Sequence, residues 1–290
     1  MSVKKAVFLY NTESGKGRIA RKAEAICAIF RDGGYDIEPR RIDFAVNPFD
    51  GYETIDLMVA AGGDGTVNYV LNAMKRKGLD IPVGVIPAGT ANDFSGAVGM
   101  PHDPLEAARQ IAGGEVERVD CGCVNGLWFV NVFSFGIFTT TSQRTSDERK
   151  HRFGKLAYLF EGARELRTMH AVPLRVKTDD GEFRFDALMA LIFNGETAGG
   201  FRLARQASIR DGLLDCILLE KRGFLHSLFS MCRYLLGGDP RTVRRFRSRR
   251  LEISSTVDEP TDVDGQKGAR FPLRIACQAG GLRVMRPRRR

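Results

Sequence analysis

The chain has 290 residues, 43% of them apolar, enough to bury the core of one large domain or two ordinary ones. Its longest apolar run, 187–193, is far shorter than the roughly 20 residues that cross a bilayer, so we expect a globular, cytoplasmic protein. Six cysteines without a CxxC pair argue against a zinc site or a disulfide framework, and the net charge of +9 indicates an anionic partner.

Strand and helix signals alternate through the first 120 residues. Short apolar runs predict strands at 6–10, 37–42, 55–61 and 82–86. Apolar residues at helical spacing predict helices at 19–30, 67–74 and 105–111. Strands separated by single helices imply parallel pairing, so residues 1–120 are expected to form an open, mostly parallel α/β sheet domain.

The pattern changes to all-β after residue 120. Asn125-Gly126 and Asp180-Gly181 each lie between extended stretches, which is typical of hairpins. Further strands are predicted at 214–219, 251–255, 271–277 and 282–285. We therefore expect an antiparallel second domain over 121–279, with a last strand near 280–290 that could return to the first domain.

Three glycine-bearing turns follow predicted strands of the first domain. They are "NTESGKG" at 11–17, "GGDGT" at 62–66 and "PAGTAND" at 87–93. The carboxyl ends of parallel strands meet at one sheet edge, where backbone amides and a helix N-terminus attract phosphate. A carboxylate among such amides suggests a bound cation, so Asp64 and Asp93 are candidate partners of nucleotide-bound Mg²⁺, with helix capping as the structural alternative.

These turns, with "SIRDGLLD" at 208–215 and "VDGQKGARFPLRI" at 263–275, resemble the diacylglycerol kinase catalytic family, which includes sphingosine and ceramide kinases and soluble bacterial lipid kinases. The resemblance spans nearly the whole chain. It implies a nucleotide domain similar to those of phosphofructokinases and NAD kinases, followed by a β-sandwich domain. It also implies transfer of the ATP γ-phosphate to the hydroxyl of diacylglycerol or a related lipid, in phospholipid biosynthesis.

The resemblance also assigns roles to individual residues. The predicted catalytic residues are Asp64, Asp93, Asp264 and Gln266. A structural Mg²⁺ would be held by Ser208, Asp211 and the backbone of Leu213. The predicted nucleotide contacts are Asn11, Thr12, Glu13, Ser14, Gly15, Gly63, Asp64, Gly65, Thr66, Val67, Asn68, Tyr69 and Thr90.

Residue 266 departs from the family pattern. The family has a glutamate general base after the Asp-Gly of this turn, whereas this chain has Gln266, whose amide takes no proton. Phosphoryl transfer depends mostly on positioning and electrostatics, so a glutamine could still orient the attacking hydroxyl. Asp264 could supply the carboxylate instead, because strand alternation would point the side chains of residues 264 and 266 similarly.

Two other functions remain open from the sequence. An NAD kinase would use the same GGDG turn on another acceptor, although "GTANDF" and "SIRDGLLD" follow the lipid-kinase pattern. Alternatively, Gln266 could mark a lipid- or nucleotide-binding protein that has lost catalysis.

The charge is concentrated in arginines 241–250 and in the last five residues. Apolar residues recur at helical spacing in the segment just before the first cluster, 224–236. This composition suits peripheral association with the anionic inner face of the membrane, and a packed core helix fits it equally well. Nucleic acid is not expected, since the arginines are not interleaved with stacking aromatics. A homodimer is left open.

Overall fold

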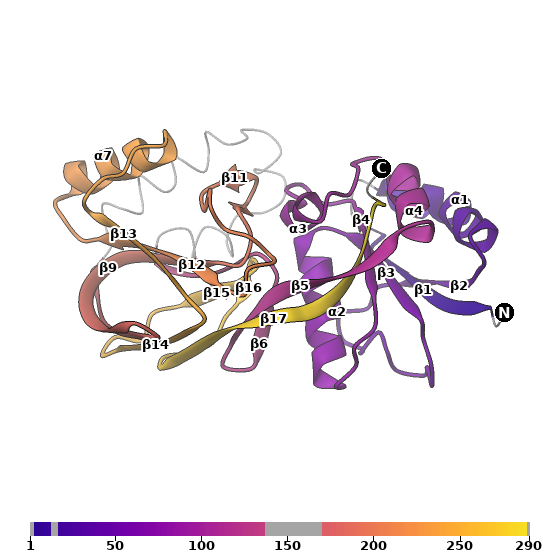
Figure 1. Ribbon diagram of the computed structural model, residues 1–290, viewed down its shortest axis with the longest axis horizontal. Coiled ribbons are helices and arrows are strands. Elements are labelled where there is room, and N and C mark those ends of the chain that lie inside the picture. The colour runs from indigo at the N-terminus through magenta and orange to yellow at the C-terminus, as the bar shows by residue number, and fades with distance from the viewer. Residues whose placement is uncertain (1–2, 13–16, 137–169, 289–290) are drawn as a thin grey trace.

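The computed structural model describes residues 3–12, 17–136 and 170–288. Its first half alternates strands and helices, and Figure 1 shows it at the right. The elements of this half are β1 (Lys4–Tyr10), α1 (Arg18–Asp32), β2 (Tyr35–Arg41), β3 (Leu57–Gly62), α2 (Asp64–Arg76), β4 (Val83–Pro87), α3 (Asp93–Ala97) and α4 (Pro104–Ala112).

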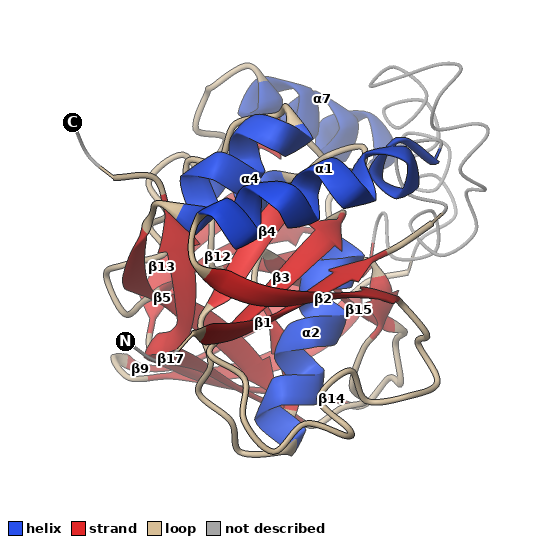
Figure 2. Cartoon of the chain, turned by 90° about the vertical axis from the view of Figure 1, so that its right-hand side faces the viewer, coloured by secondary structure: helices blue, strands red, loops and turns tan. Residues whose placement is uncertain are grey.

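The first domain is a three-layer α/β structure. Its strands pair in parallel in the order β2-β1-β3-β4, and every residue of β3 and β4 is buried, as expected of strands covered on both faces. Figure 2 shows α1 and α4 on one face of this sheet and α2 on the other. The apolar residues of α1 at helical spacing, such as Ile19, Ile26 and Phe30, are the ones it buries.

The second half lies at the left of Figure 1. Its described part consists of strands, which pair antiparallel, and one helix. Apolar side chains of both layers form a separate buried core, which makes this domain a β-sandwich. Its elements are β5 (Glu115–Val124), β6 (Leu127–Phe129), β7 (Val132–Gly136), β8 (Val172–Thr178), β9 (Gly181–Phe193), β10 (Thr197–Ala198), β11 (Phe201–Arg202), β12 (Leu214–Glu220), α7 (Phe224–Leu235), β13 (Val243–Ser248), β14 (Arg250–Ser255), β15 (Thr261–Val263), β16 (Gln266–Lys267) and β17 (Leu273–Arg286).

Two long strands, β5 and β17, connect the domains. They pair with each other antiparallel and cross from one half of the molecule to the other in Figure 1. The sequence predicts two strands, 271–277 and 282–285, where the structure has the single strand β17. The difference arises because a register shift between Gln278 and Leu282 interrupts the side-chain alternation along β17. Beyond that shift, Val284 pairs in parallel with Val83 of β4, so the end of the chain extends the first domain's sheet.

The predicted fold class, α/β followed by an antiparallel sandwich, is confirmed. Three local features differ from the sequence prediction. The short helix α3 was not expected, and the extended stretch expected after Asn125-Gly126 is divided between β6 and β7. The arginine cluster forms the strand β13, which pairs with β12. No helix in the described part of the chain is long and apolar enough to span a membrane.

Candidate active site

Two of the three glycine turns pack directly against each other. They follow β3 and β4, whose ends are in register at Gly62 and Pro87. A Cβ atom on Gly89 would lie 2.5 Å from the Cα of Gly63, so only glycine allows this approach. Asn92, with a φ of 54°, fixes the second turn because its side-chain amide accepts from the N–H of Gly89 and donates to its carbonyl. The turns thus form one preorganised edge.

Asp64 begins α2 directly after the Gly63 N-cap and holds the start of α3. Its Oδ2 accepts from the backbone N–H of Asp93 at 3.1 Å, and its Oδ1 accepts from that of Phe94 at 2.9 Å. The side-chain amide of Asn131 also donates to Oδ1, at 3.0 Å. The expected capping role is therefore real, but it serves the neighbouring helix α3, and Asn131 adds a link to the second domain.

Asp93 lies beside Asp64 and is buried. Burial raises the pKa of the Asp93 carboxyl, and the nearby charge of Asp64 raises it further. The backbone N–H of Gly200, between β10 and β11, donates to both carboxylate oxygens at 3.1 and 3.3 Å. Two neighbouring carboxylates that repel each other fit a divalent cation, and oxygen ligands are those Mg²⁺ prefers.

The predicted nucleotide contacts lie in the turn after β1, in the turn after β4 and at the start of α2. Asn11 and Thr12 lie at the end of β1, and Thr90 is exposed in the turn after β4. Glu13, Ser14 and Gly15 lie outside the described residues. Gly63, the N-cap of α2, and Gly65, in its first turn, are half-buried.

The remaining predicted contacts lie further along α2. Thr66, Val67 and Asn68 are buried, and Asn68 donates to the carbonyl of Trp128. The Tyr69 hydroxyl donates to the carbonyl of Asp43. These side chains face the interior or the neighbouring loop because α2 packs against the sheet, and their contact with a nucleotide stays a prediction.

Gln266 lies at this edge although it is about 200 residues from the GGDGT turn in the sequence. It begins β16, is exposed, and its Nε2 would be 3.9 Å from a Cβ built on Gly65. The β15–β16 hairpin that carries it has the two-residue turn Asp264-Gly265, with φ values of 49° and 88°. The hairpin thus places Gln266 opposite the GGDGT turn.

The side chain of Asp264 points elsewhere. Its carboxylate accepts from the backbone N–H groups of Val130, Asn131 and Val132 and from the side chain of Asn68. Burial raises its pKa to about 6, opposed by these hydrogen bonds. The expectation that residues 264 and 266 point similarly is wrong, because positive φ angles break the strand alternation. Asp264 instead ties the hairpin to α2 and to the β6–β7 connection.

The loop 208–215, predicted to hold a structural cation, is stabilised by contacts of Asp211, Asp215 and Asp120. Asp211 Oδ1 accepts from the Leu213 N–H at 3.1 Å, while its Oδ2 lies 3.8 Å from the Arg247 guanidinium. Arg247 also donates to Asp215 at 3.0 Å. Asp120 accepts from the Gly212 N–H and, on its other oxygen, from that of Gly280 in β17.

One carboxylate oxygen of this loop is available to bind a cation. Oδ2 of Asp215 is buried without a hydrogen-bond partner among the described residues, and burial and the charge of Asp211 raise its pKa. No cluster of three or more His, Cys, Asp or Glu side chains suited to a metal occurs in the described segments. A cation here would therefore also need hydroxyl and carbonyl oxygens, such as those of Ser208 and Leu213.

Sequence reasoning missed three residues of the site. Asn131 and Gly200 hold the two carboxylates, and Asp120 joins the cation loop to β17. Their partners lie 67, 107 and up to 160 residues away, so no local spacing marks them.

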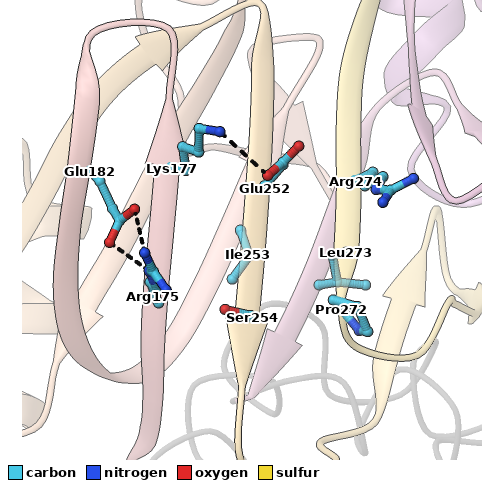
Figure 3. Close-up of a pocket in the computed structure, with 9 residues that line it drawn as sticks. All are labelled: Arg175, Lys177, Glu182, Glu252, Ile253, Ser254, Pro272, Leu273 and Arg274. Atoms are coloured by element: carbon cyan, nitrogen blue, oxygen red, sulfur yellow. Dashed lines mark hydrogen bonds and ion pairs between the residues drawn. The ribbon is translucent and has the colours of Figure 1, made fainter.

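A hollow elsewhere on the sandwich is not part of this site. Figure 3 shows its lining residues on β8, β9, β14 and the start of β17. Its charged groups are largely paired: Arg175 contacts Glu182 at 2.5 Å, and Lys177 contacts Glu252 at 3.9 Å. No described residue of the glycine turns lines it.

Comparison with known proteins agrees with this geometry. Residues 5–124 match a family model described as the diacylglycerol kinase catalytic domain. A curated diacylglycerol kinase from Staphylococcus aureus (strain bovine RF122 / ET3-1) is 31% identical over 278 residues, which are 93% of this chain and 88% of that protein. The chain belongs to the diacylglycerol kinase family.

Other matches extend over both domains of this family member. Residues 131–286 match a model described as the YegS C-terminal NAD kinase beta sandwich-like domain. A diacylglycerol kinase from Staphylococcus saprophyticus is 30% identical, covering 93% of this chain and 91% of that protein. The crystal structure of a diacylglycerol kinase from Bacillus anthracis str. Sterne has the same fold, with a TM-score of 0.82 and 22% identity over 99% of this chain and 98% of that one. The family inferred from the motifs is confirmed, and the chain is a kinase.

Proposed function

We propose that this kinase transfers the γ-phosphate of ATP to the hydroxyl of diacylglycerol or a related lipid. The observation that carries the proposal is the meeting of three parts at one edge: the glycine turns, the Asp64–Asp93 pair and the exposed Gln266 beside Gly65. A phosphate donor, a cation and an acceptor hydroxyl could be held there together. The curated relatives named diacylglycerol kinase support the choice of lipid.

The backbone around Gly63 and Gly65 would bind the phosphates. The first N–H groups of α2 are unsatisfied by intrahelical bonds, and the helix dipole favours negative charge at this end. The Gly63–Gly89 contact fixes both turns, so they need little rearrangement on binding.

Asp64 and Asp93 would organise the cation. Asp64 Oδ2 accepts one hydrogen bond, from the Asp93 N–H, and keeps a lone pair for coordination. Mg²⁺ bound there would neutralise charge developing on the transferred phosphoryl group. A second cation in the loop of Ser208, Asp211 and Leu213 would serve structure instead, through the Asp120 bridge to β17.

Gln266 would position the acceptor hydroxyl. Its amide oxygen can accept the hydrogen bond of an attacking alcohol, although it cannot remove the proton. Because the transition state is loose, the proton need not leave early, and turnover persists at a reduced rate.

Mass spectrometry tests the proposal directly. The purified protein is incubated with Mg-ATP and a total lipid extract in detergent, with NAD as acceptor in a parallel reaction and Asp64→Asn as the negative control. We expect a phosphorylated lipid with the wild type alone.

Either of two other results contradicts the proposal. Phosphate found on NAD would show an NAD kinase, which uses the same GGDG turn. ATP binding without transfer to any acceptor would show a binding protein that has lost catalysis.

A further inference from the structure

Helix α7 carries apolar side chains on its outer face as well as on the face that packs against the sandwich. It buries Ser227, Ser230 and Met231, which are 0%, 2% and 6% exposed, and packs Leu228 and Tyr234 against the sandwich, but it turns other large apolar side chains outward. Those side chains are Leu225, Phe229 and, just after the helix, Leu236, with exposed fractions of 77%, 64% and 89%. Packing against the sandwich therefore explains only part of the apolar surface of this helix, and the exposed part needs another explanation.

The exposed side chains form one narrow stripe. At 100° per residue, Leu225, Phe229 and Leu236 lie within about 40° of one another around the helix axis, and the exposed Cys232 lies about 20° to one side of them. Figure 1 shows α7 at the upper left, at the end of the second domain far from the first. Such a continuous apolar stripe on a surface indicates a contact.

A basic hollow lies at the N-terminus of α7. It is lined by Arg222, Gly223, His226, Arg241 and Thr242. The helix has no side-chain cap and no acidic residue in its first turn. Thr242 is 5% exposed, and its Oγ1 has no hydrogen-bond partner within the described segments. A buried hydroxyl without a partner, among cations and a helix N-terminus, suits a bound phosphate group.

The charges around the hollow are only partly neutralised. Arg222 pairs with Glu220 at 3.0 Å, but no partner of the exposed Arg241 guanidinium occurs in the described part of the chain. Arg233, which is also exposed, adds a further cation to α7. The apolar stripe is thus flanked by positive charge.

We propose that α7 docks the protein on an anionic phospholipid bilayer, with Leu225, Phe229 and Leu236 inserted among the acyl chains and a lipid phosphate in the hollow at the helix N-terminus. Charge complementarity selects this occupant. A second copy of the chain would bring the same cations face to face, and a nucleic acid would leave the leucines exposed to water. The purpose of the surface rests on the proposed function, since a lipid kinase must reach lipid in a membrane.

Vesicle sedimentation without ATP tests the inference. The vesicles contain either phosphatidylcholine alone or an equimolar mixture with phosphatidylglycerol, and no diacylglycerol. We expect binding to the mixed vesicles only. The apolar variant combines Leu225→Ser, Phe229→Ser and Leu236→Ser, and the basic variant combines Arg222→Gln with Arg241→Gln.

The expected losses are large. Losing three inserted side chains should weaken binding at least about 100-fold, and losing two cations at the lipid surface about thirtyfold. The apolar control, Val3→Ser, Val116→Ser and Val257→Ser, changes exposed residues outside α7 and should bind as the wild type does. Arg270→Gln with Arg274→Gln is the control of equal charge.

Three outcomes would overturn the inference. They are unchanged binding by both α7 variants, equal binding to both vesicle types, or lipid-free self-association that the apolar variant abolishes. Because all mutated side chains are exposed, thermal midpoints equal to the wild type will verify folding. Turnover on detergent-dispersed lipid, measured separately, should be unchanged in both variants. Wild-type protein that binds vesicles but phosphorylates no lipid would contradict the proposed function alone.

Discussion

Asp64 combines a structural and a chemical task in one carboxylate. Substituting Asp64→Asn places an amide NH₂ against the N–H donors of Asp93 and Phe94, and removes the charge that would hold the cation. Charge-assisted hydrogen bonds contribute about 1.5–3 kcal/mol, so we expect a loss of roughly 2 kcal/mol in the free energy of unfolding together with loss of turnover. Urea unfolding and a kinase assay measure the two effects. Asp32→Asn, on the surface of α1, is the control; wild-type turnover of Asp64→Asn would contradict the assignment.

Gln266 is the residue at which this chain departs from its family. Substituting Gln266→Glu supplies a proton acceptor of similar size, opposite the GGDGT turn. General-base catalysis typically contributes on the order of 10² to 10⁴ in rate, so we expect initial rates on an accepted lipid to rise. Gln266→Ala is the matched control and should fall below the wild type, since it orients nothing. If Gln266→Ala equals the wild type, residue 266 has no role in transfer.

At the scale of elements, the β15–β16 hairpin is held by the buried carboxylate of Asp264. Its pKa of about 6 lies above the roughly 3.9 of an unfolded chain, so the folded state binds the proton more tightly. The contribution of this group to stability is therefore largest below pH 4 and falls as the pH rises to about 6. Relative to Asp264→Asn, the wild type should lose roughly 3 kcal/mol of unfolding free energy between pH 4 and 7. Urea unfolding across this range measures the difference, and a difference that stays flat or rises would contradict the shift.

The loop 208–215 is also stabilised by charge, through the cation that we propose it holds. We expect the thermal midpoint of the wild type to fall when EDTA replaces Mg²⁺, because a bound ion stabilises the folded state by mass action. Asp211→Ala should have a lower midpoint and a smaller response to Mg²⁺, because the ion at Asp64 and Asp93 is unaffected. Asp180→Ala, in the β8–β9 turn, is the surface control and should respond as the wild type does. A full Mg²⁺ response in Asp211→Ala would place the ion elsewhere.

For the whole molecule, the end of β17 is the part that joins the two domains. Deleting residues 281–290 removes the buried side chains of Leu282, Val284 and Met285 and uncovers the edge of β4. Each such side chain contributes about 1.5–3 kcal/mol when buried, so the total loss is comparable to the stability of a typical protein. We expect rapid proteolysis and no cooperative thermal transition. Deletion of 287–290, which lies beyond the strand, is the control; cooperative unfolding of the longer deletion would show that the domains fold without this strand.

The sequence by itself determined the elements and the family. Strands such as β3 and β4 are continuous apolar runs, and the inner faces of α1 and α2 repeat with helical period, so local pattern suffices to predict them. The glycine turns also follow from sequence, because a backbone that approaches another backbone leaves no room for a side chain. The short helix α3 and the arginine-rich β13 were missed, since neither has a strong period of its own.

The tertiary structure alone decided which side chains act together. It turned Asp264 inward and left Gln266 outward, because two positive φ angles reversed the chain between them. It directed the side-chain amide of Asn68 to the carboxylate of Asp264 in the β15–β16 hairpin, and it brought Asn131 to Asp64, 67 residues away in the sequence. It also distinguished a core helix from a surface helix at α7, where the apolar stripe is exposed and the serines are buried. Periodicity records that one face of a helix is apolar, whereas the direction of that face depends on contacts with residues distant in the chain.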